Sequence, residues 1–155
     1  MIQRIQTVYL LIIVLLSGFT IFLPLADLLN TSEGLTYLVN LKGIYLIQGA
    51  ENIYQSSVWS LSMLTILIPV LSIVTIFSYK NRVKQIRLSV INMLVMIGFY
   101  VLLFLYLWLG SKNLNADWHL RTVCILPLIN IILNYLAIGA IGKDEALVKS
   151  LDRIR

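Results

Sequence analysis

Four long stretches without a charged side chain constrain this chain more than any other feature of its sequence. They cover residues 8–26, 58–79, 88–109 and 122–141, and none contains Asp, Glu, Lys, Arg or His. A helix needs about 20 apolar residues to cross the roughly 30 Å hydrocarbon core of a bilayer. The composition agrees, because 12% of the residues are charged, whereas a soluble domain is about one quarter charged. The sequence therefore predicts four transmembrane helices.

We predict one all-α integral membrane domain over residues 1–155, a four-transmembrane-helix bundle. The helices are expected at about 5–26, 58–79, 88–109 and 121–142, with an outer loop at 27–57 and a cytoplasmic tail at 143–155. The first apolar run continues without a small-residue cleavage pattern, which predicts an uncleaved first helix rather than a signal peptide. Cys124 is the one cysteine, so no disulfide framework forms within the chain.

The distribution of Lys and Arg predicts the orientation of the helices, since positive charges are retained on the cytoplasmic side. Three basic residues lie in the predicted outer loops: Lys42, Lys112 and Arg121. Nine lie at the opposite ends of the helices: Arg4, Lys80, Arg82, Lys84, Arg87, Lys143, Lys149, Arg153 and Arg155. This asymmetry predicts that both termini are cytoplasmic. Because the basic residues lie at the membrane edge, they predict contact with anionic lipid headgroups and no nucleic-acid partner.

The predicted outer loop contains a candidate β-hairpin at residues 35–48. This segment is rich in β-branched and aromatic residues, and Asn40 and Gly43 are turn-forming residues between two apolar runs. One interpretation is a cap that lies on the outer ends of the helices. The other is an exposed edge or apolar patch that docks another protein.

Three asparagines form the candidate polar core of the predicted bundle: Asn92, Asn130 and Asn134. Lipid offers a carboxamide nothing to bond to, so we expect these side chains to face the protein interior. There they would bond neighbouring helices, for roughly 0.6 kcal/mol each. The alternative role is binding of a polar headgroup or a small solute.

A second candidate cluster lies at the predicted outer interface: Asp117, Trp118, His119 and Arg121. Tryptophan and charged anchors are common at this depth of a membrane. One histidine and one aspartate do not make a zinc site, since catalytic zinc normally takes three protein ligands. We therefore expect an anchoring role, and the sequence predicts no catalytic, metal or cofactor site. Asp27 and Glu51 are candidates to join the cluster in space.

The tail carries a candidate partner-docking stripe at helical spacing: Leu147, Val148, Leu151 and Ile154. Acidic residues near the start of this segment and basic residues near its end suit a helix dipole. We predict a short amphipathic C-terminal helix. It would lie on the inner leaflet or dock a cytoplasmic or membrane partner.

The two ends of the chain resemble a known family. The opening MIQRIQT and the closing KDEALVKSLDRIR are similar to an uncharacterised family of small tetraspan membrane proteins from Bacteroidota, domain-of-unknown-function family 4293. The segment Leu23, Pro24 and Leu25 also fits its pattern. The resemblance implies four helices and the inner membrane of a Gram-negative cell, and it implies no activity. The end motifs map onto residues whose roles stay unassigned: Arg4, Gln6, Asp144, Glu145, Asp152 and Arg153.

The leading functional hypothesis is a non-enzymatic accessory or assembly partner of another envelope complex. It rests on the lack of charged side chains within the predicted spans. Transporters and membrane enzymes usually carry such side chains within the membrane. The alternative is a transporter-like protein that handles a small solute or lipid through the core lined by asparagines. A membrane enzyme that uses Asp117, His119 and Arg121 is the least favoured class, because no nucleophile stands beside the histidine.

Overall fold

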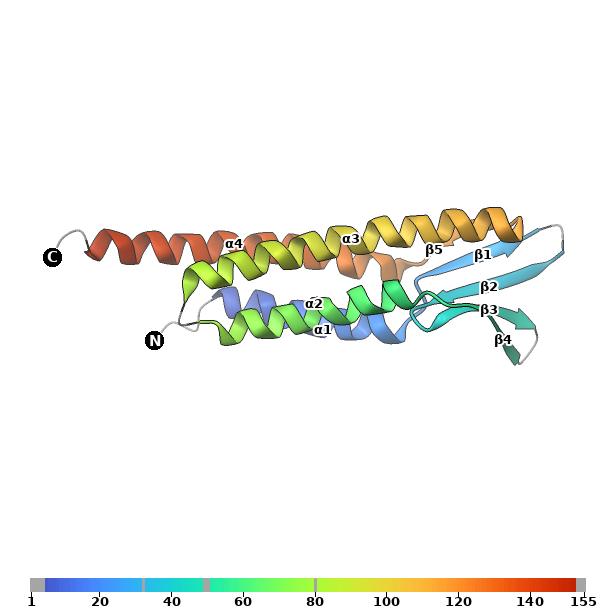
Figure 1. Ribbon diagram of the computed structural model, residues 1–155, viewed down its shortest axis with the longest axis horizontal. Coiled ribbons are helices and arrows are strands. Elements are labelled where there is room, and N and C mark those ends of the chain that lie inside the picture. Colours follow the sequence, from blue (N-terminus) through green and yellow to red (C-terminus); the bar gives the residue numbers. More distant parts are fainter. Residues whose placement is uncertain (1–4, 32, 49–50, 80, 153–155) are drawn as a thin grey trace.

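A computed structural model describes residues 5–31, 33–48, 51–79 and 81–152, with helices at one end and a β-sheet at the other (Figure 1). Both described ends of the chain lie away from the sheet. We call these two ends of the molecule the terminal end and the sheet end. The helices are α1 (Ile5–Phe22), α2 (Trp59–Phe77), α3 (Arg82–Leu114) and α4 (Ile125–Asp152), with the short 3-10 helix η1 (Thr122–Cys124) before α4. The strands are β1 (Ala26–Asn30), β2 (Leu35–Asn40), β3 (Gly43–Gln48), β4 (Glu51–Ser56) and β5 (Asp117–Leu120).

Among the described residues, four helices are long and apolar enough to cross a membrane. Helix α1 packs against α2 and α4, and α3 also packs against α2 and α4. In each candidate span, two thirds or more of the residues are not buried inside the protein. Apolar side chains therefore cover the outside of the helices as well as the contacts between them.

The sheet is an antiparallel meander with strand order β4-β3-β2-β1-β5. Strand β1 alternates between buried and half-buried residues, as expected when one face of a sheet packs against the protein. That face meets the last turns of α3, where a Cβ on Gly110 would lie 3.1 Å from Leu28 Cδ1. The Asn30 side-chain amide also donates to the Leu114 carbonyl at 3.0 Å. Helix α3 has 33 residues, or about 50 Å at 1.5 Å per residue, so it is long enough both to span and to support the sheet.

The all-α prediction was wrong, because the chain contains this five-stranded sheet. The expected hairpin is present as β2 and β3, with Asn40 opposite Gly43. The three other strands were not predicted. Residues 23–26 were predicted to be the end of the first apolar helix, whereas β1 begins at Ala26. Strand β5 was missed because it has only four residues and contains no apolar run. Strand formation in such segments depends on non-local partners, which local composition does not reveal.

The charged tail is not a separate element. Helix α4 runs without interruption from Ile125 to Asp152, so the predicted amphipathic helix is the continuation of the fourth apolar helix. Gly142 lies inside this helix and does not end it. A glycine in a helix interior costs only about 1 kcal/mol relative to alanine, which the bonds of a long helix offset.

The tight turn between β2 and β3 generates a testable prediction at Gly43. Its φ is 154°, and a Cβ there would lie 2.7 Å from Tyr54 Cε2 and 2.8 Å from the Ser56 carbonyl oxygen. Gly43→Ala should therefore lower the free energy of unfolding by about 1–3 kcal/mol, measured by thermal unfolding in detergent.

Gly34→Ala is the matched control, because Gly34 also has a positive φ, 66°, but nothing lies within 4 Å of its Cβ position. In the control, only the unfavourable backbone conformation of alanine should lower the stability. Its melting temperature should therefore fall less than that of Gly43→Ala. Equal decreases would contradict the close packing of β4 against the start of β3.

Candidate functional site

Carboxamide side chains connect neighbouring helices in the interior of the helical part. Asn92 of α3 donates to Ser72 Oγ of α2 at 2.8 Å, and Gln85 of α3 donates to the Thr75 carbonyl of α2 at 3.0 Å. Asn134 of α4 donates to the Ser89 carbonyl of α3 at 2.8 Å. Asn130 of α4 donates to Ser17 Oγ of α1 at 3.1 Å. These four bonds join α2 to α3, α3 to α4 and α4 to α1.

Within the described part of the chain, the side-chain oxygens of the buried amides differ from the nitrogens, because they have no protein partner. Among the described residues, no donor reaches the side-chain oxygens of Gln6, Gln85, Asn92, Asn130 or Asn134, all of which are buried. All of these amides except Gln6 are seen to bond neighbouring helices through their N–H groups, while their oxygens accept from no donor in the described part of the chain. A buried acceptor of this kind raises the cost of burying the amide, so each contact adds little net stability.

The sequence interpretation missed two members of this group, Gln6 and Gln85. Both were placed outside the predicted apolar stretches, yet both continue a helical stripe that the sequence contains. Gln85 stands four residues before Ser89, which precedes Asn92 by three, and Gln6 stands four residues before Leu10. Offsets of three and four place residues on one helix face. Extending each stripe by one turn beyond the apolar run would have found them.

The cluster at the sheet end forms around β5 and β1. Arg121 Nε donates to Asp27 Oδ2 at 2.8 Å and to Oδ1 at 3.0 Å. The Arg121 side chain is 42% exposed, so this pair contributes about 0–1 kcal/mol. In the register of β1 and β5, His119 lies opposite Asp27. The ring of Trp118 meets that of Phe104 edge to face, with 6.3 Å between the centroids.

The structure brings Asp27 into this cluster and leaves Glu51 outside it. Glu51 begins β4 at the opposite edge of the sheet, four strand spacings or about 19 Å from β5. The residues of β5 are all exposed. Within the part of the chain that the structure describes, no three His, Cys, Asp or Glu side chains come close enough to hold a metal ion. The arrangement serves to fasten β5 and the start of α4 to β1.

The candidate docking stripe of the tail is only partly described. Leu147, Val148 and Leu151 lie in the last turns of α4, where the backbone alone is described. Ile154 lies outside the described residues. One contact does hold the start of this segment, because the Arg82 guanidinium donates to the Asp144 carbonyl. The first turn of α3 is therefore fixed beside α4 at the terminal end.

The contact between Asn92 and Ser72 predicts a small coupling energy. In a double-mutant cycle of Asn92→Leu and Ser72→Ala, we expect about 0.6 kcal/mol, and no more than about 1.7. The value should be small because Ser72 keeps its bond to the Ile68 carbonyl at 3.0 Å. Reversible unfolding by dodecyl sulfate in mixed micelles measures it.

Thr20→Ala replaces Ser72→Ala in the control cycle. Thr20 is also buried and bonds a carbonyl of its own helix, that of Leu16, without contacting Asn92. Its coupling to Asn92→Leu should be close to zero. The interhelical bond would be refuted if both cycles gave the same coupling energy.

Nearly the whole chain matches one known protein family. A family model described as a domain of unknown function, DUF4293, matches residues 2–154. No curated protein matches the sequence. The match includes all four apolar helices and all five strands, so it covers the polar contacts and the sheet-end cluster together. The chain therefore belongs to the DUF4293 family of domains of unknown function.

Proposed function

We propose that this chain is a non-enzymatic accessory protein of the bacterial inner membrane, which offers the free edge of its sheet to a partner protein. The observation that carries the proposal is the exposed strand β4, which lies at one end of the strand order. Three parts of the proposal have separate support: the membrane, the orientation and the contact edge.

The membrane placement is supported by the outward-facing apolar surface of the helices. Large apolar side chains on this surface are more than half exposed, and all four helices contribute: Leu11, Phe19, Met63, Leu94, Val101, Ile132 and Tyr135. Soluble monomers rarely expose apolar patches larger than a few hundred Å². A hydrocarbon environment removes this cost, and the length of the helices suits it.

The orientation is supported by the distribution of basic residues over the two ends of the molecule. At the terminal end, α3 begins with Arg82, Lys84 and Arg87. The sheet end carries fewer basic residues, and Arg121 there is paired with Asp27. Positive charge is retained on the cytoplasmic side. We infer that the termini are cytoplasmic and that the sheet faces the periplasm.

Single cysteines in a Cys124→Ser background test the orientation. Ser150→Cys should resist an impermeant thiol reagent added to intact spheroplasts and react after lysis, whereas Asn113→Cys should react in both. The background is conservative because the Cys124 thiol donates to the Leu25 carbonyl at 3.0 Å, a bond that a hydroxyl can make. Labelling of Ser150→Cys in intact spheroplasts would refute the orientation.

Strand β4 is the contact edge that the geometry favours. It pairs with β3 on one side, and in Figure 1 it lies on the side of the sheet farthest from α3. Ile53 and Tyr54 on it are 44% and 54% exposed. The other edge, β5, contacts α3. An open edge presents unpaired backbone N–H and C=O groups, to which a partner can add an extended strand.

An accessory role fits the interior of the helices better than solute transport does. Residues 88–111 of α3 carry no charged side chain, whereas coupling ions and substrates usually require one within the membrane. Four of the buried amides also bond neighbouring helices through their N–H groups, so movement of one helix would break these contacts. A rigid support for the sheet is the simpler role.

The edge is tested by introducing a charge on β4. Ile53→Lys should reduce recovery of the copurifying partner at least tenfold after mild-detergent extraction, because a lysine on an edge strand opposes strand addition. Leu120→Lys on β5 is the matched control, since Leu120 is also 44% exposed. Membrane abundance of both variants is measured alongside. Equal partner recovery from the two variants would refute β4 as the contact edge.

A further inference from the structure

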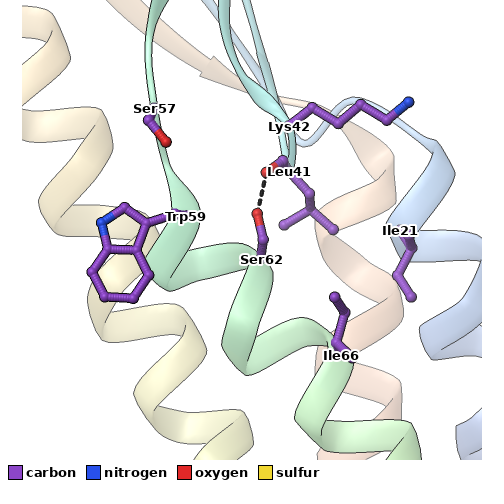
Figure 2. Close-up of a pocket in the computed structure, with 7 residues that line it drawn as sticks. All are labelled: Ile21, Leu41, Lys42, Ser57, Trp59, Ser62 and Ile66. Atoms are coloured by element: carbon purple, nitrogen blue, oxygen red, sulfur yellow. Dashed lines mark hydrogen bonds between the residues drawn. The ribbon is translucent and has the colours of Figure 1, made fainter.

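A pocket of about 360 Å³ lies at the sheet end, between the helices and a turn of the sheet. Its apolar wall comes from Ile21 of α1, Ile66 of α2 and Leu41 of the turn between β2 and β3. Figure 2 shows these three side chains converging on one space, with Lys42 extending above Ile21. The pocket thus has an apolar interior with one cation at its margin.

The strand directions explain why this turn reaches the helices. Strand β1 leaves α1 toward the far end of the sheet, and the antiparallel β2 returns, so residues 41 and 42 lie back beside the helices. Ser62 in the first turn of α2 donates to the Leu41 carbonyl and holds the turn there. The wall of the pocket is therefore fixed by the fold.

The pocket lies where two candidate spans end. Ile21 is the last residue but one of α1, whereas Ser62 and Ile66 lie in the first two turns of α2. Trp59, the first residue of α2, also lines the pocket and is exposed. Tryptophan is enriched at the headgroup level of membranes. If Lys42 lies at the depth of the lipid headgroups, Ile66 therefore lies at the depth of the acyl chains.

We propose that this pocket binds one phospholipid with an anionic headgroup, its phosphate beside Lys42 and the upper part of an acyl chain against Ile21, Leu41 and Ile66. The inference rests on the membrane placement proposed above and not on the partner edge. Among the described side chains, no carboxylate forms an ion pair with Lys42, whereas Arg121 at the same end pairs with Asp27. An amphiphile matches both the apolar wall and the free cation, which a polar solute does not.

Native mass spectrometry of the full chain in detergent tests the headgroup. Phosphatidylglycerol or phosphatidylcholine is added, and the fraction of protein that retains one lipid is compared. A lysine near an anionic headgroup is worth roughly fivefold in affinity, so Lys42→Ala should lower phosphatidylglycerol binding about fivefold and reduce its preference over phosphatidylcholine.

Lys112→Ala is the matched control. Lys112 is the other exposed lysine of the sheet end, but its Nζ lies 3.9 Å over the Trp108 ring and does not line the pocket. Its replacement should leave binding unchanged. Equal losses for the two lysines would overturn the proposal, because they would indicate general attraction of lipid to a basic surface. Absence of any preference for phosphatidylglycerol in the wild-type protein would also overturn it.

Ile66→Trp tests the apolar part of the site by filling the space below Lys42. It should lower retention of both lipids, and soluble glycerol phosphate should not displace bound phosphatidylglycerol from the wild type. Displacement by glycerol phosphate would overturn the phospholipid assignment in favour of a free phosphate. Carbonate extraction of each variant distinguishes failure of the membrane placement from failure of the lipid site. Release of the protein from membranes would refute the proposed placement. A protein that stays in the membrane but shows no lipid preference would refute only the lipid site.

Discussion

The pairing of β1 with β5 joins the N-terminal and C-terminal parts of the chain at the sheet end. It aligns residues 26–29 with residues 117–120, which are about ninety positions apart in the chain. Strand β1 follows α1 and β5 precedes α4, so the ladder places these two helices side by side at the sheet end (Figure 1). The Arg121 backbone N–H donates to the Leu25 carbonyl at 3.0 Å, which continues the connection to the helix ends. The contact of Asn130 with Ser17 between the same helices depends on that alignment.

Helix α3 provides the surface that makes the sheet stable. An isolated two-stranded hairpin is marginal in water, and a sheet gains stability by packing an apolar face against a helix. Leu28 packs near Gly110, where the missing side chain allows close approach, and Asn30 bonds the last turn of the helix. Helix α2 fixes the turn that carries Lys42, because Ser62 donates to the Leu41 carbonyl, while β4 at the edge farthest from α3 stays open. Both proposed binding surfaces therefore follow from how α2 and α3 hold the sheet.

Much of the helical part could be predicted from the sequence. A run of about 20 apolar residues without a charge has few alternatives to a membrane helix, because every backbone group must be bonded within the segment. The same reasoning gave buried positions for Asn92, Asn130 and Asn134. It missed Gln6 and Gln85, since both lie beyond the edges of the apolar runs. The hairpin of β2 and β3 could also be predicted, because Asn40 and Gly43 flank a two-residue turn between strands that are neighbours in sequence.

What the sequence by itself determined is thus local: four apolar helices, one hairpin and the polar stripes on helix faces. Only the tertiary structure decided that β1, β4 and β5 join the hairpin in one sheet, and that α4 continues through Gly142. It also decided that Asp27 meets Arg121 while Glu51 lies at the far edge. The physical reason is that helices and tight hairpins are bonded within short segments, whereas strands such as β1 and β5 acquire their bonds from partners distant in the chain.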